Sequence, residues 1–191
     1  MKTFKIILIS LVCSISTVNS TYSSATDYTF LAAQKIKFKY YIGVIPFEGF
    51  FMLKDSIFAI NFKKPETSRL SLKFDLNSSS AGFFLATNAM LGKSVLYAEK
   101  FPYILFESKT IKAKGNEFTI KGNVTIRGIT KGIILSATLK NPEILKSLDK
   151  NNLQFNILAE FRRSDFKATG YRNIVGEVVK LNSKVDLVLT E

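Results

Sequence analysis

Apolar residues occupy every second position of the stretch 118–126, and polar residues lie between them. Successive side chains of a β-strand point to opposite faces, so a period of two predicts a strand with one buried face and one wet face. The alternation resumes over 133–139, and Gly128 and Gly132 lie between the two runs. Glycine permits the backbone angles of short hairpin turns. The stretch therefore predicts an antiparallel β-hairpin with one apolar face.

The same alternation recurs along much of the chain. It is found at 35–40, 47–53, 58–62, 70–76, 104–108, 153–161 and 179–189. Asp55-Ser56 is expected to be a turn between two of these strands. An antiparallel sheet of about eight strands can close on itself, which removes its exposed edges and leaves room inside for side chains or one small ligand. We therefore expect an all-β barrel.

The stretch 83–97 breaks the alternation and predicts one short helical insertion. Ser80 is expected to cap the helix, which would run through Leu91 and end at Gly92. The apolar residues of this stretch suggest two alternatives. The insertion is either a lid over an apolar cavity or a plug that only closes one end of the barrel.

Residues 1–20 have the features of a secretory signal peptide. Lys2 and Lys5 precede an apolar run over 6–15, and small residues follow at 18–20. The run is too short for a transmembrane helix, which needs about 20 apolar residues. We therefore expect a signal peptide at 1–20, a barrel domain at 21–191, and a periplasmic protein. Cys13, the one cysteine of the chain, lies in the signal, so the remaining domain would have no disulfide.

Residue types needed for common catalytic sites are missing from the sequence. The chain has no histidine, which excludes Ser-His-Asp triads and the common zinc sites. Glycine-rich phosphate-binding loops are also absent from the sequence. We therefore expect a binding protein and not an enzyme, with no cofactor and no metal.

The chain is basic. It has 27 Lys and Arg against 15 Asp and Glu, a net charge of +12, and loss of Lys2 and Lys5 with the signal would leave +10. This charge suggests an anionic partner such as a membrane surface; the alternative is that lysines on the wet faces only confer solubility. No block is dense enough to indicate nucleic acid. An outer-membrane barrel is disfavoured, since each lysine facing lipid would cost about 2–4 kcal/mol.

Three ordered motifs resemble the YceI-like family of bacterial exported proteins. They are Tyr-Ala-Glu-Lys-Phe-Pro-Tyr-Ile-Leu-Phe at 97–106, Ile-Lys-Gly-Asn-Val-Thr-Ile-Arg-Gly-Ile-Thr-Lys at 120–131, and Arg-Ser-Asp-Phe at 163–166. The resemblance spans about 28–189 and implies a lipocalin-like barrel that binds polyisoprenoids or other long-chain amphiphiles. Five residues in these motifs are expected to have structural roles, with Arg163 and Asp165 forming an ion pair or a turn clamp: Pro102, Gly128, Arg163, Asp165 and Phe166.

The chain departs from the family pattern in the helical insertion. Members usually carry His-Leu-Arg-Ser-x-Asp-Phe there, whereas this chain has Ala-Met-Leu-Gly-Lys-Ser-Val at 89–95. A family histidine near Tyr40-Tyr41 is missing, and Gly132 replaces a usual proline. We expect loose selection of the headgroup, with tail length dominating affinity.

The leading hypothesis is a periplasmic carrier for a long-chain isoprenoid, such as a quinone-like molecule, or an acyl lipid. The alternative is an exported stress or surface-interaction protein that binds anionic lipid or polymer through its basic face, without a cavity ligand. A completely filled core is a further option, and the oligomeric state is left open, with a dimer possible. The candidate ligand-binding residues are Phe38, Tyr40, Phe58, Ile60, Phe83, Phe84, Met90, Leu91, Leu96, Phe106, Phe118, Ile120, Val124 and Phe161.

Overall fold

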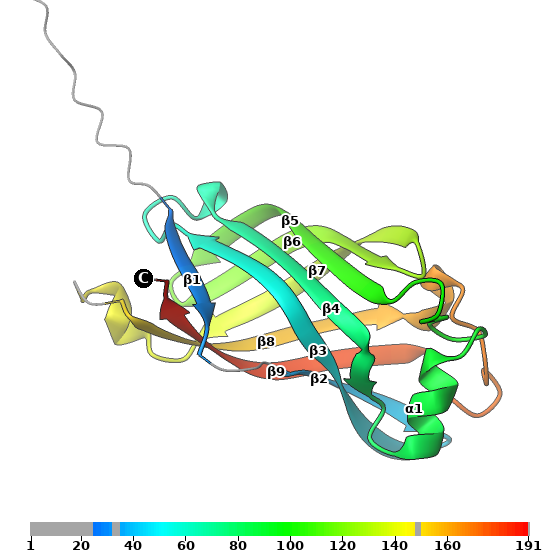
Figure 1. The fold of residues 1–191 in the computed structure, drawn as a ribbon. Helices are drawn as coiled ribbons and strands as arrows, with labels where there is room; N and C mark the ends of the chain where they lie inside the picture. The colour runs from blue at the N-terminus through cyan, green and yellow to red at the C-terminus, as the bar shows by residue number, and fades with distance from the viewer. Residues whose placement is uncertain (1–24, 32–34, 148–149, 191) are drawn as a thin grey trace, which may run out of the picture.

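The computed structural model describes residues 25–31, 35–147 and 150–190 (Figure 1). The predicted signal peptide at 1–20 lies outside these residues. The described chain forms nine strands, one α-helix and three short 3-10 helices, at 65–67, 142–145 and 163–166. Their order is β1 (Thr26–Phe30), β2 (Lys35–Ile42), β3 (Ile45–Ile60), β4 (Arg69–Ser80), α1 (Phe84–Leu91), β5 (Tyr103–Lys114), β6 (Glu117–Ile126), β7 (Ile129–Leu139), β8 (Asn152–Arg162) and β9 (Val178–Leu189).

The sheet is antiparallel and closes into a barrel, as the sequence predicts. Its order is β3-β2-β9-β8-β7-β6-β5-β4, and pairing of β4 with β3 closes the ring. The short strand β1 pairs with one end of β3 and with β9. It therefore shares with β2 the place between β3 and β9, and the barrel has eight positions around its circumference. β1 was not predicted from the sequence.

The hairpin of β6 and β7 confirms the alternating pattern. Phe118, Ile120, Val124 and Ile126 are buried, whereas the intervening side chains are exposed or half-buried. The turn consists of Arg127 and Gly128, with φ of 54° and 73°, as a two-residue type I′ hairpin turn requires. β7 thus begins at 129, four residues earlier than the predicted strand.

The prediction of a turn at Asp55-Ser56 is wrong, because β3 continues through it. Asp55 lies opposite Lys73 and Ser56 opposite Leu72 in the ladder with β4. Register irregularities occur between residues 50 and 52 and between 53 and 55, and bulges of this kind bend a strand without ending it. Pairing with β4 therefore outweighs the local turn preference.

Helix α1 begins later than predicted. Ser80 is the last residue of β4, and Phe83 precedes the helix without a capping side chain. Thr87, inside the helix, accepts a hydrogen bond from the Ala81 N–H at 3.0 Å. The predicted end is confirmed, because the Gly92 N–H donates to the Asn88 carbonyl at 3.1 Å and the helix stops there.

The hydrophobic core lies inside the barrel, and α1 lies at one end of it (Figure 1). Leu139 and Leu153 are fully buried, whereas Lys35 and Lys37 alternate outward with the buried Ile36. Across the described ranges, no helix has the length and apolar character to cross a membrane.

Candidate ligand cavity

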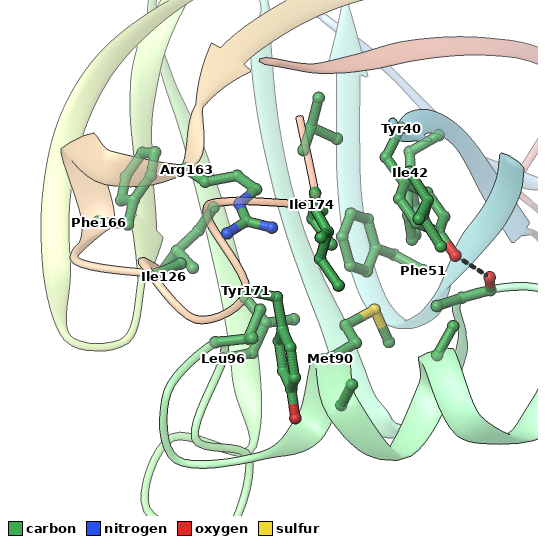
Figure 2. A pocket seen from close by; sticks show the side chains of 18 of the residues that line it. Tyr40, Ile42, Phe51, Met90, Leu96, Ile126, Arg163, Phe166, Tyr171 and Ile174 are labelled. Carbon is green, nitrogen blue, oxygen red and sulfur yellow. Dashed lines mark hydrogen bonds between the residues drawn. The ribbon is translucent and has the colours of Figure 1, made fainter. Parts of the chain in front are cut away.

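A cavity of about 250 Å³ lies at the end of the barrel that α1 covers (Figure 2). Inward side chains of β2 and β3 form one wall, α1 and the following loop form another, and the segment 161–179 forms the third. Apart from Arg163, the described residues that line it are all apolar or aromatic. Phe83, Leu85, Tyr171 and Ile174 line the cavity and are also exposed to solvent. The cavity therefore reaches the surface between α1 and the segment 171–174.

Aromatic side chains from β2 and β3 build the apolar wall. The ring of Phe38 stacks on that of Phe51, with centroids 4.4 Å apart. The Tyr40 hydroxyl donates to the Ala81 carbonyl at 2.8 Å (Figure 2), so its polar atom is satisfied. Burial raises the pKa of Tyr40 above its ordinary value. The wall is therefore uncharged at neutral pH.

Arg163 places a positive charge in the wall formed by the segment 161–179. It is only 7% exposed, and its Nη2 donates to the Gly170 carbonyl at 2.5 Å. Its Nε is buried and has no hydrogen-bond partner within the described part of the chain. Burial lowers the pKa of Arg163, and the charge of Glu177 partly opposes that shift. The guanidinium stays protonated, since arginine is not deprotonated in proteins.

The neighbouring carboxylate of Glu177 is engaged by other groups. It accepts hydrogen bonds from the Ser164 N–H, at 3.1 Å, and from the Ser164 hydroxyl. It also lies 3.6 Å from Nε of Arg162. The Ser164 hydroxyl lowers the pKa of Glu177, helped by the charges of Arg162 and Arg163. Among the residues that the structure describes, no carboxylate is hydrogen-bonded to Arg163 in the cavity wall.

A second, smaller cavity of about 60 Å³ lies toward the other end of the barrel. The inward residues of β6 show how the interior is divided. Phe118 and Ile120 line the small cavity and Ile126 lines the large one. Val124, between them on the strand, is buried and lines neither. A packed layer therefore separates the two cavities.

The structure brings part of the predicted ligand-binding set together. The large cavity takes six of these residues: Phe38, Tyr40, Phe83, Met90, Leu96 and Phe161. The small cavity takes four: Phe58, Ile60, Phe118 and Ile120. Four line neither cavity: Phe106 and Val124 are buried in the dividing layer, Leu91 is half-buried, and Phe84 is 75% exposed.

The residues predicted to be structural do not form one cluster, and each makes its own contacts. Phe166 is 2% exposed and packs edge-on against Phe161, with centroids 5.7 Å apart, yet it also lines the cavity. Arg163 clamps the turn through Gly170 and not through Asp165, which is exposed. Of the two expected arrangements, the ion pair between Arg163 and Asp165 is not found among the described residues, and Arg163 alone makes the turn clamp.

The other two structural residues are Pro102, which directly precedes β5, and Gly128, which lies in the turn between β6 and β7. The Pro102 carbonyl accepts from the Leu76 N–H at 2.9 Å. At Gly128, a Cβ would lie 2.8 Å from the ring of Phe101, so only glycine leaves room for that ring.

Sequence reasoning missed several lining residues. Tyr171, Ile174 and Val175 lie in a segment without alternation, which a bridge between Ile42 and Val175 fixes beside β2. That pairing joins residues far apart in the sequence, so local patterns hold no signal for it. Arg163 did carry a signal, as part of a conspicuous polar cluster.

Comparisons with known proteins agree with this architecture. The YceI-like domain matches residues 17–188 of the chain. A UPF0312 protein of Yersinia pestis is 31% identical over 85 residues, which are 44% of each protein. Protein YceI of Salmonella arizonae is 30% identical over 91 residues, 48% of each. The matched region spans less than half the length of these curated relatives.

Solved structures share the fold at low sequence identity. BcnA of Burkholderia cenocepacia superposes with a TM-score of 0.69 and 21% identity, covering 83% of this chain and 100% of that one. A YceI protein of Campylobacter jejuni gives 0.62 and 19%, covering 99% and 92%. A polyisoprenoid binding domain from Saccharophagus degradans, implicated in plant cell wall breakdown, gives 0.62 and 12%, covering 87% and 99%.

Proposed function

The chain belongs to the YceI-like family, and from that premise we propose that it carries a long-chain isoprenoid or acyl lipid in the cavity beside α1. The observation that supports this most is the cavity of about 250 Å³, lined by apolar side chains and one buried arginine. A structural neighbour is a polyisoprenoid binding domain, which supports the same class of ligand. The role is binding and transport, with no reaction assigned.

The tail of the ligand would supply most of the affinity. Each buried methylene contributes about 0.8 kcal/mol. At about 250 Å³, the cavity is slightly smaller than the roughly 300–1,000 Å³ of ordinary ligand sites. A long chain would therefore extend out of the mouth or displace the layer that separates the two cavities.

The polar end of the ligand would lie at Arg163. A buried donor without a partner costs about 1–3 kcal/mol, and Nε of Arg163 is such a donor. An acceptor oxygen of a carboxylate, a phosphate or a quinone would satisfy it. The proposal therefore favours amphiphiles with an acceptor group over plain hydrocarbons.

Native mass spectrometry of protein purified gently from its own cells would test the carrier role. We expect an added mass that organic extraction removes and that lipid analysis identifies as a long-chain amphiphile. Protein that is empty after purification, and that takes up neither a polyprenyl lipid nor a fatty acid in vitro, would contradict it.

We also propose that the carrier works in the periplasm after removal of residues 1–20. The protein should then appear in the osmotic-shock fraction with its amino terminus near Thr21. An uncleaved amino terminus in the cytoplasmic fraction would contradict this location.

The second candidate is a surface-binding protein that uses its basic charge without a cavity ligand. The net charge of +10 that would remain after loss of Lys2 and Lys5 with the signal supports it. Binding of this kind should weaken steadily as salt screens the charges. An empty cavity together with salt-sensitive binding to an anionic polymer would favour this candidate over the carrier.

A further inference from the structure

Exposed apolar side chains gather around the opening of the large cavity. We call six of them the mouth rim: Val44, Ile45, Phe84, Leu85, Tyr171 and Ile174. Each is more than half exposed, and Val44 reaches 91%. A contiguous apolar patch is unusual on a monomeric protein surface and marks a site of interaction.

Backbone hydrogen bonds and a ring contact join the segments that carry the rim. The Gly43 N–H donates to the Ile174 carbonyl at 2.7 Å, and the Gly176 N–H donates to the Tyr41 carbonyl at 2.8 Å. These bonds hold the β2–β3 turn against the segment 171–176. The ring of Phe47 lies 5.5 Å from that of Phe83, which ties β3 to the start of α1. The segments that carry the rim are therefore held together beside the cavity mouth.

The charges on these segments have one sign. The stretches 41–47, 83–97 and 167–176 contain Lys93, Lys167 and Arg172, and they contain no aspartate or glutamate. All three basic side chains are exposed. Four acids lie within two residues of these stretches, Glu48, Glu99, Asp165 and Glu177. Of these, Glu177 is engaged by Ser164 and Arg162. An apolar surface whose own segments carry three cations and no carboxylate matches the chemistry of an anionic bilayer, with phosphates outside and acyl chains inside.

We propose that the mouth rim docks on an anionic lipid bilayer, with its apolar side chains in the headgroup region and the cavity opening toward the membrane. The proposal rests on the carrier role only for the identity of the cargo. A lipid could then pass between bilayer and cavity without exposing its tail to water. A second copy of the chain fits less well, because two rims face to face would bring Lys93, Lys167 and Arg172 close to cations of the same kind.

The absence of tryptophan from the chain allows a specific probe. We would place one indole on the rim with Phe84→Trp and, as a matched control, one on the barrel wall with Leu158→Trp. Phe84 is exposed and lines neither cavity, and Leu158 is 45% exposed on β8. Vesicles of phosphatidylcholine with about one third phosphatidylglycerol should shift the emission of the rim variant to the blue and leave the control unchanged.

A negative charge introduced at the rim extends the test. Val44→Glu, at a fully solvated turn position that lines neither cavity, should weaken co-sedimentation with the same vesicles about tenfold or more. Ile134→Glu, on the outer face of β7, should not change it. Vesicles of phosphatidylcholine alone should bind the wild type more weakly.

The outcomes separate docking from the carrier role. An unshifted rim indole, or equal vesicle binding by both glutamate variants, would overturn the docking proposal even if the protein retains lipid. A protein that docks normally but is empty would leave docking supported and contradict the carrier. A dimer that forms without vesicles and is abolished by Val44→Glu would instead assign the rim to a second copy and overturn the proposal.

Discussion

The ring of Phe106 lies directly on the backbone of Gly122, so that a Cβ added to this glycine would lie 2.5 Å from Cζ of the ring. Phe106 is on β5 and pairs with Val124 of β6, next to Gly122 on the inner face. The glycine leaves space for an aromatic ring in the middle of the barrel. This contact forms part of the layer that divides the interior into two cavities.

Replacing Phe106 with alanine should join the two cavities. The loss of a buried ring is expected to cost about 3–5 kcal/mol of stability, so Phe106→Leu serves as a milder variant. Both variants should prefer longer fatty acids than the wild type in native mass spectrometry with a series of chain lengths. Leu158→Ala, on the outer wall, should keep the wild-type preference. An unchanged chain-length profile in both Phe106 variants would show that the layer does not limit the ligand.

Gly122→Ala should destabilise the barrel by about 1–3 kcal/mol, as overpacking of a core does. The added methyl would meet the Phe106 ring and also the Glu107 carbonyl, at 2.5 Å each. Gly132→Ala is the matched control, because nothing lies within 4 Å of its Cβ position and its φ is not positive. Urea unfolding would compare the two. Equal stability of the two variants would argue against the close packing at Gly122.

The barrel was predictable because its inner face repeats with a period that local sequence shows. β6 is the clearest case, with Phe118 and Ile120 buried and Lys121 exposed. The errors have non-local causes. Asp55-Ser56 resembles a turn, but pairing with Lys73 and Leu72 keeps both residues in a strand. Ser80 resembles a helix cap, but it ends β4.

The candidate site was less predictable than the fold. Alternation shows which side chains face inward, yet it does not show whether an inward residue such as Phe106 fills the core or lines a cavity. That distinction depends on space left by distant strands. The segment with Tyr171 and Ile174 has no periodic pattern, and its position follows from hydrogen bonds to β2. The sequence singled out Arg163 as part of a polar cluster, but the orientation of its side chain depends on a hydrogen bond to Gly170, seven residues later.

Arg163→Met should reduce retention of fatty acids more than retention of a chain that has no acceptor group. Methionine is an apolar side chain of similar length that lacks the Nε donor. We expect about a tenfold loss of fatty-acid affinity, equivalent to about 1.4 kcal/mol. Displacement of a fluorescent fatty acid would measure it. Arg162→Met is the control, since that side chain is 67% exposed. Equal losses for both kinds of chain would assign Arg163 a purely structural role.

Glu177 should make the thermal stability of the protein depend on pH. Its pKa is lowered in the folded state by the Ser164 hydroxyl, so its contribution is present above the unfolded pKa of about 4.3 and is lost as pH falls through the lower folded value. Glu177→Gln should therefore lower the Tm at pH 7, and the difference from the wild type should shrink toward pH 3. Glu160→Gln, for which no such hydrogen bond is found among the described residues, is the control. A Tm difference that is constant with pH would contradict this role.

The Met90→Glu variant should show whether α1 acts as a lid over the cavity or as a plug that closes the barrel end. Met90 is the buried residue of α1 and lines the large cavity, whereas Asn88 on the same helix is exposed. A carboxylate at position 90 would place charge in an apolar wall, which disfavours an acyl chain there. If α1 is a lid, lipid retention should fall while the far-ultraviolet circular dichroism of the sheet is preserved, and Asn88→Glu should change neither. Loss of the sheet signal would identify α1 as a plug that the barrel needs in order to fold, and retention equal to the wild type would remove α1 from the site.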